Sequence, residues 1–119
     1  MNPLILIVED EAMVSLALEL AVIDLGMDVL GPAASVAHAI ALLEGRSISG
    51  AILDGNLGDG DVTPLAWRLL DDAIPFILHS ALVTPAILDE HLPASIPVIA
   101  KPSPPSLVIR ALVELMDGV

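Results

Sequence analysis

Residues 4–11 read Leu-Ile-Leu-Ile-Val-Glu-Asp-Glu, and this stretch decides the fold. Five consecutive aliphatic residues without polar alternation are typical of a strand that is covered on both faces, as in a parallel sheet between two helical layers. Three acids end the strand, and an apolar pattern with helical spacing follows over residues 12–26. The predicted core stripe of this helix comprises Met13, Leu16, Leu20 and Ile23.

The same alternation of strand and helix continues along the chain. Further strands are predicted at residues 28–34, 51–54, 75–79 and 96–100. Helices are predicted from a Ser35 cap to residue 45, from a Thr63 cap to residue 73, from a Thr84 cap to a point before Pro93, and after residues 103–105 to about residue 117. Five such units predict an α/β fold, a doubly wound (βα)5 sandwich with a parallel sheet and right-handed crossovers. We expect one domain over residues 1–119, with no output domain in this chain.

Composition excludes several classes of function. The formal net charge is −12, with only 4 basic residues against 16 acids, which argues against binding a nucleic-acid backbone. Aromatic residues make up 2%, so a base-stacking platform is not expected. Cysteine is absent, which excludes disulfides and thiolate chemistry. No apolar run approaches the length of a membrane span, and we expect a cytoplasmic protein.

Polar side chains stand at the carboxyl ends of four predicted strands. These residues are Glu9 and Asp10, Asp54, Ser80 and Lys101. Functional groups of doubly wound sheets gather at this edge, so these side chains are expected to converge. Three crowded carboxylates repel one another, and Mg²⁺ relieves such crowding because it prefers oxygen ligands. An ionised aspartate beside the cation could attack phosphorus and form an aspartyl phosphate.

Taken singly, most of these residues have an ordinary structural interpretation. Glu9 and Asp10 resemble first-turn acids of a helix, and Asp54 resembles a turn residue. Lys101 differs because it is the only lysine of the chain and lies between an apolar strand and Pro102. The joint placement of suitable residue types at four strand ends favours a functional site.

The ordered set of motifs resembles a response-regulator receiver domain of bacterial two-component signalling. The motifs are Glu9-Asp10 after the first strand, Ile-Leu-Asp-Gly-Asn-Leu over residues 52–57, Ile-Leu-His-Ser-Ala over residues 77–81, and Lys101-Pro102. They extend over essentially the whole chain. The resemblance implies a flavodoxin-like sheet with strand order 2-1-3-4-5. It also implies a phosphorylation-dependent switch that receives its phosphoryl group from a histidine kinase or histidine phosphotransfer protein.

The resemblance assigns roles to individual residues. Asp54 is the implied phosphoacceptor, and Ser80 and Lys101 are implied to contact phosphoryl oxygens. Mg²⁺ is implied to bind Glu9, Asp10 and Asp54 together with the backbone carbonyl of Asn56. The protein is then not an enzyme on other substrates, because it catalyses only its own phosphoryl transfer and slow autodephosphorylation.

Four positions are implied to modulate this site. Ala81 matches a position that is kept small for access of the phosphodonor. Leu82 and Asn56 match positions that affect phosphoryl lifetime, and an apolar Leu82 is expected to hinder attacking water. Val98 stands where receivers usually carry an aromatic switch residue, so the usual aromatic readout is absent.

Surplus apolar residues on the first and last helices have two interpretations. Val14, Leu18, Ala21 and Leu25 form a second apolar line on the first helix, and the last helix is apolar over most of its circumference. Either tertiary burial is wide, or these helices present a patch to a second copy of the chain or to a helical kinase or phosphotransfer protein.

Other classes of binding site fit the sequence less well than a receiver-type site does. A calcium loop starting at Asp54 would need glycine where Asp59 stands, and a dinucleotide-binding fold would need a glycine-rich turn after the first strand. The remaining alternative is a receiver-like interaction module that does not depend on phosphorylation. His38, His79 and His91 are scattered and are interpreted as incidental, although His79 adjoins Ser80.

Overall fold

The computed structural model describes residues 2–55, 62–80 and 95–117 of the chain. Strands are β1 (Leu4–Val8), β2 (Asp28–Ala33), β3 (Gly50–Asp54), β4 (Phe76–Ser80) and β5 (Val98–Ala100). Helices are α1 (Ala12–Asp24), α2 (Val36–Leu43), α3 (Thr63–Asp71) and α5 (Pro105–Asp117). The helix predicted between Thr84 and Pro93 lies outside the described residues.

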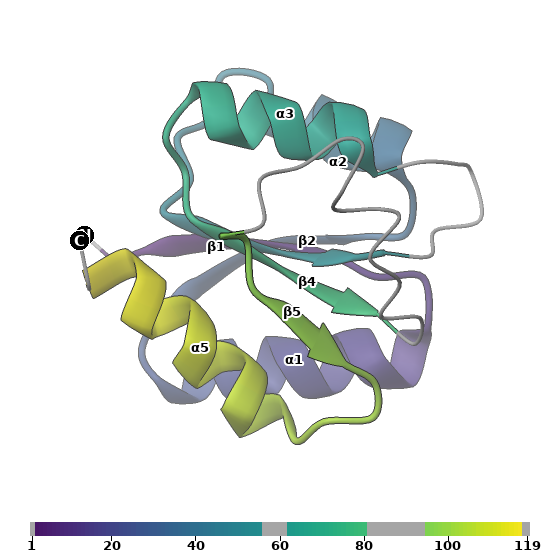
Figure 1. The fold of residues 1–119 in the computed structure, drawn as a ribbon, viewed down its shortest axis with the longest axis vertical. Helices are drawn as coiled ribbons and strands as arrows, with labels where there is room; N and C mark the ends of the chain where they lie inside the picture. Colours follow the sequence, from purple (N-terminus) through teal and green to yellow (C-terminus); the bar gives the residue numbers. More distant parts are fainter. Residues whose placement is uncertain (1, 56–61, 81–94, 118–119) are drawn as a thin grey trace.

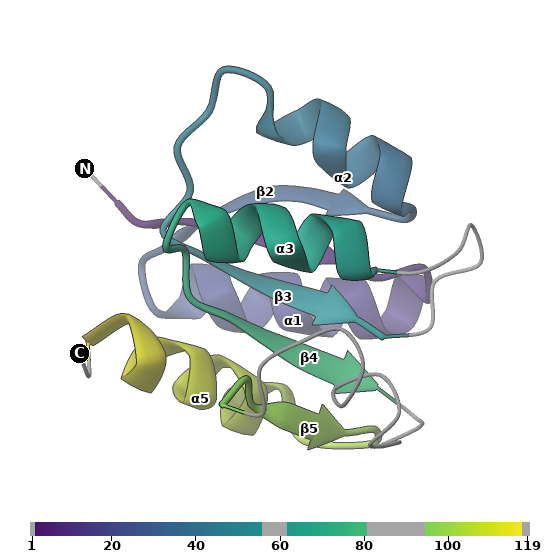
Figure 2. The same cartoon turned by 45° about the horizontal axis from the view of Figure 1, so that its top comes forward.

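The five strands form one parallel sheet in the order β2-β1-β3-β4-β5, which confirms the predicted fold class. Helices α2 and α3 cover one face of the sheet, and α1 and α5 lie side by side on the other (Figures 1 and 2). All five carboxyl ends therefore point to the same edge, which brings the strand-end residues together.

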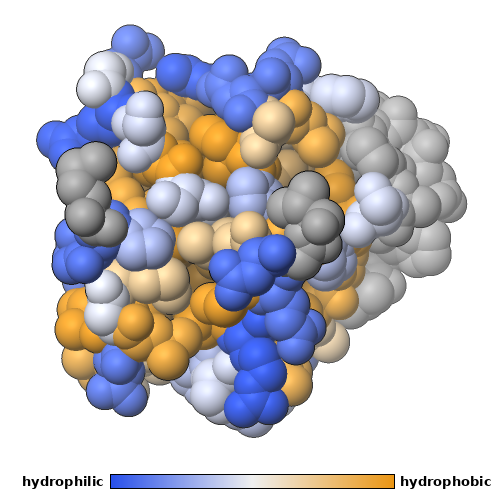
Figure 3. All heavy atoms as spheres, turned by 90° about the vertical axis from the view of Figure 1, so that its left-hand side faces the viewer, coloured by the Kyte–Doolittle hydropathy of each residue, from blue (hydrophilic) through white to orange (hydrophobic). Residues whose placement is uncertain are grey.

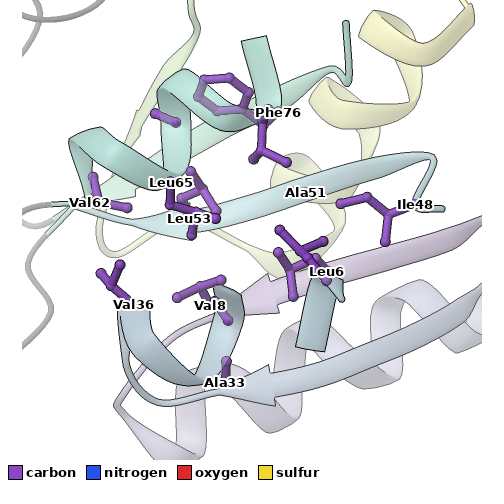
Figure 4. Close-up of a cluster of buried hydrophobic side chains, with 14 of the residues drawn as sticks. Leu6, Val8, Ala33, Val36, Ile48, Ala51, Leu53, Val62, Leu65 and Phe76 are labelled. Carbon is purple, nitrogen blue, oxygen red and sulfur yellow. The ribbon is translucent and has the colours of Figure 1, made fainter. Parts of the chain in front are cut away.

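Two apolar cores separate the sheet from its helical layers. Odd-numbered side chains of β1, such as Ile5 and Ile7, pack with α1 and α5. Even-numbered ones, such as Leu6 and Val8, pack with α2 and α3 in the cluster drawn in Figure 4. Burial on both faces explains why β1 is a continuous aliphatic run.

The sequence prediction chose the wrong face of α1. Leu18 and Val22 are buried against the sheet, with Val14 and Ala21 packed beside them, whereas the predicted core stripe is exposed. That stripe contains Met13, Leu16, Leu20 and Ile23, which are 81%, 51%, 58% and 53% exposed. Apolar residues occupy nearly all sides of α1, so helical periodicity does not determine which side meets the sheet.

Of the two predicted helix caps in the described part of the chain, one is confirmed and one is wrong, and the last strand begins later than predicted. Ser35 does cap α2, because its hydroxyl oxygen accepts a hydrogen bond from the His38 amide at 3.0 Å. Thr63 does not cap α3; it is the first helical residue, and Val62 occupies the cap position with a helical backbone. Strand β5 begins at Val98 rather than at residue 96.

On α5, Val108, Ile109 and Leu112 are buried, and Leu107 is the one large apolar residue of this helix that is strongly exposed. The wide apolar pattern of α5 therefore reflects mainly tertiary burial. Figure 3 views the molecule from the side where α5 ends and shows apolar side chains at the surface between hydrophilic ones. Within the described residues, no helix has the length and apolar character needed to cross a membrane.

Candidate functional site

Three carboxylates meet at the carboxyl edge of the sheet. Glu9 follows β1 and Asp54 ends β3, and both are nearly fully buried, while Asp10 is exposed. One carboxylate oxygen from each of these residues lies within 4.8 Å of the others. Oxygen donors at this spacing, two buried and one open to solvent, fit the coordination preferences of Mg²⁺.

Lys101 follows β5 directly and points its ammonium group into this cluster. Its Nζ atom lies 2.8 Å from Glu9 Oε1 and 3.3 Å from Asp54 Oδ2. A longer contact of 3.5 Å reaches Oε1 of the exposed Glu11. The Lys101 amide donates to the Ser80 carbonyl at 3.0 Å, which extends the pairing of β4 and β5 and fixes where the lysine side chain starts.

The backbone around the cluster is held by hydrogen bonds that continue the sheet. The Glu9 amide donates to the Ala33 carbonyl at 2.8 Å, and the Glu11 amide donates to Glu9 Oε2 at 3.1 Å. The bond from the Glu11 amide orients the Glu9 carboxylate, and its donor lies in the same loop as Glu9. The Lys101–Pro102 peptide bond is cis.

Ser80 ends β4 and is buried next to the loop that follows Asp54. A Cβ atom built on Gly55 would lie 2.9 Å from Ser80 Oγ. This distance is shorter than real Cβ contacts, so glycine at position 55 leaves the room that the Ser80 hydroxyl occupies. The hydroxyl is thus placed beside the backbone that leaves Asp54.

The electrostatics of the cluster are strongly perturbed. Burial raises the pKa of Glu9 to about 7, and Asp54 adds to this effect while Lys101 opposes it. Burial alone would lower the pKa of Lys101, but its hydrogen bond and charge interaction with Glu9, followed by Asp54, raise it above the usual value. Lys101 therefore stays protonated, and Glu9 holds a proton near neutral pH unless a cation binds.

The structure brings together Glu9, Asp10, Asp54 and Lys101, with Ser80 at the same edge. Val98 lies in β5, pairs with Leu78, and packs against the core below α2 and α3. The predicted positions Asn56, Ala81 and Leu82 lie outside the described residues.

Two residues at this edge were not assigned a role from the sequence. Glu11 contacts Lys101, although an acid next to a helix start is usual and gave no distinguishing signal. His79 is 3% exposed, and neither of its ring nitrogens has a hydrogen-bond partner in the part of the chain that the structure describes. For His79, the signal in the sequence was a histidine inside an otherwise apolar strand.

Comparison with known proteins gives a consistent result for the fold. No family model and no curated protein matches the chain. A solved response regulator receiver protein from Sinorhizobium medicae WSM419 has a TM-score of 0.84 and 28% identity, over 98% of this chain and 95% of that one. SdrG from Sphingomonas melonis Fr1 has a TM-score of 0.77 and 33% identity, over 97% of both chains.

Longer proteins also contain this fold. The response regulator PhyR from Brucella abortus matches with a TM-score of 0.78 and 28% identity over 98% of this chain. The chain spans about half the length of such PhyR proteins, 48% in this case and also 48% for an anti-anti-sigma factor PhyR from Bartonella quintana.

Proposed function

The chain belongs to the response-regulator receiver family, and on this premise we propose that it is a signalling switch that accepts a phosphoryl group on Asp54 with Mg²⁺. The observation that carries the proposal is the meeting of three carboxylates within 4.8 Å, with Lys101 Nζ 3.3 Å from Asp54 Oδ2. Receiver proteins are signalling proteins, so we propose no activity on other substrates beyond slow loss of the protein's own phosphoryl group.

The charges of the site suit an incoming phosphoryl group. Three carboxylates, one divalent cation and one ammonium together have no net charge, so an anionic donor is not repelled. Bound Mg²⁺ would supply positive charge that stabilises the phosphoryl oxygens in the transition state. Glu9, Asp10 and Asp54 would hold it, with the Asn56 carbonyl as a further proposed ligand.

The remaining steps belong to the protein's own side chains. An Asp54 carboxylate oxygen forms a bond to phosphorus while the bond from phosphorus to the donor nitrogen or oxygen breaks. The donor keeps the electron pair of the broken bond. Lys101 stabilises negative charge on the transferred group, and Ser80 donates a hydrogen bond to one of its oxygens.

We propose a histidine kinase or a histidine phosphotransfer protein as the physiological donor. Its docking surface would be the α1 stripe, defined as Met13, Leu16, Leu20 and Ile23. Helix α1 begins at the loop that contains Glu9, so a helical partner on this stripe could bring a phosphohistidine to Asp54. A second copy of the chain is the other proposed occupant, and an apolar helix face of this size is typical of interaction surfaces.

The test is the mass of the intact protein after treatment with acetyl phosphate. We expect a gain of one phosphoryl group that requires Mg²⁺ and is lost in Asp54→Asn. Asp24→Asn, at the exposed end of α1, is the matched control and should label normally. Absence of labelling in the natural sequence would favour an interaction module that does not depend on phosphorylation.

A further inference from the structure

A cavity of about 500 Å³ lies between the start of α1 and the segment that joins β5 to α5. Apolar lining residues come from both sides, and they include Met13, Val14, Leu18 and Pro105. Few polar side chains reach its wall; they are Glu11, His79, Lys101 and Ser103. This volume and this mixture of many apolar and few polar groups are typical of small-molecule sites.

His79 is the buried polar group of this wall. Its side chain extends from β4 toward the layer of α1 and α5, and only 3% of the residue is exposed. Among the described residues, neither Nδ1 nor Nε2 has a hydrogen-bond partner. Buried polar groups are normally paired, and an unpaired one is destabilising, so a ligand that offers a partner in the cavity would be stabilised.

The surroundings favour a neutral hydrogen-bonding group. A histidine ring that is buried against apolar side chains favours the uncharged imidazole, which offers one donor and one acceptor. Lys101 is already engaged by Glu9, Asp54 and Glu11. The described residues of the cavity wall therefore include no unpaired cation that would attract an anionic ligand.

We propose that this cavity binds a neutral, largely apolar small molecule whose single hydroxyl or N–H group pairs with His79. The apolar body would lie against Val14, Leu18 and Pro105. This site is separate from the carboxylate cluster, and its occupancy does not depend on phosphorylation of Asp54. Lys101 borders both sites, so a bound molecule would touch the side chain that contacts the phosphoacceptor.

The experiment compares two probes of nearly equal shape, phenol and toluene, by amide chemical-shift titration of the unphosphorylated protein. Phenol carries a hydroxyl where toluene carries a methyl group. We expect both to shift amides at the start of α1 and those of Lys101, Ser103 and Ser106. In His79→Leu, we expect the preference for phenol, expressed as the Kd of toluene divided by that of phenol, to fall by roughly three- to tenfold.

A second variant covers the case in which His79→Leu does not fold. Ala17→Phe introduces a ring from a half-buried helix position into the cavity, and it should abolish the shifts caused by either probe. An unchanged preference in His79→Leu would overturn the proposal. Shifts confined to the exposed α1 stripe, or shifts that persist in Ala17→Phe, would overturn it as well.

Discussion

Glu9 is buried beside two carboxylates and one ammonium, and its protonation determines the charge of the site. Its pKa of about 7 means that, in the metal-free cluster, this carboxyl group is about half protonated at neutral pH and mostly protonated below it. On the proposed assignment, Mg²⁺ binds the ionised Glu9 carboxylate and therefore displaces this proton. A single buried side chain thereby couples cation affinity to pH.

The affinity for Mg²⁺ should accordingly weaken as the pH falls through about 7. Well below this value the apparent Kd should rise by up to about tenfold for each pH unit, because one proton competes with the cation. Titration of the Gly55 amide resonance with MgCl₂ between pH 5.5 and 8.5 measures this. In Glu9→Gln the affinity should be lower and its pH dependence reduced. A Kd that is constant over this range in the natural sequence would contradict the assignment.

The residues that follow the helices show how a single residue can affect the stability of the fold. Gly26 and Gly45 follow α1 and α2 with φ of +78° and +71°, a conformation that glycine adopts without strain. After α3 the corresponding residue is Ala73, with φ of +56°. A side chain at this position meets the backbone unfavourably.

Ala73→Gly should therefore stabilise the protein by about 0.5–1 kcal/mol, measured as the free energy of unfolding in urea. Gly26→Ala is the matched control because a Cβ there would meet nothing within 4 Å, so only the backbone conformation is affected. It should destabilise by about 1 kcal/mol. Destabilisation by Ala73→Gly would refute this account of the α3 end.

The α1 stripe gives a prediction about partner recognition. Leu20→Glu places a charge in the middle of the stripe, and it should slow phosphoryl transfer from a phosphorylated histidine phosphotransfer protein of the same organism by about tenfold or more. Labelling by acetyl phosphate should be unchanged, because this small donor needs no docking surface.

Trp67→Glu is the control for that experiment. Trp67 is 46% exposed on α3, on the opposite face of the sheet, so this variant should transfer at the normal rate. Equal rates for the natural sequence and Leu20→Glu would exclude the stripe as the docking surface. Sedimentation of the natural sequence over a concentration series tests the second copy as occupant, and Leu20→Glu should abolish any self-association through this stripe.

The sequence predicts elements well where one physical rule dominates. Continuous aliphatic runs predicted β1 and β3, and the placement of acids and lysine directly after predicted parallel strands predicted that they would converge. The face of α1 was not predictable, since both candidate stripes are apolar and only contact with the sheet separates them. The unpaired state of His79 was not predictable either, because it depends on which groups surround the cavity. The Thr63 cap failed because the backbone of Val62 is already helical.

At the scale of the whole molecule, the burial of Glu9 makes the stability of the fold depend on pH. The pKa of Glu9 is raised from 4.5 to about 7 on folding, so between these values the folded protein keeps a proton that the unfolded chain has released. The contribution of Glu9 to stability is therefore full below the lower value and is lost as the pH rises through the upper one.

Glu9→Gln should consequently stabilise the metal-free protein at pH 8, by on the order of 1–3 kcal/mol, and have little effect at pH 4.5. The measurement is the difference in free energy of unfolding between variant and natural sequence at the two pH values. Glu44→Gln, at an exposed position after α2, controls for removal of one charge from a chain of net charge −12. An equal effect of Glu9→Gln at both pH values would contradict the raised pKa.

The most direct test of the central claim is the position of the phosphoryl group in the chain. The protein is treated with acetyl phosphate and Mg²⁺, reduced with borohydride so that an aspartyl phosphate becomes homoserine, and digested for peptide mass spectrometry. We predict homoserine at position 54, only in samples that contained Mg²⁺. Homoserine at another aspartate, or none at position 54 in a folded and magnesium-loaded sample, would contradict the account.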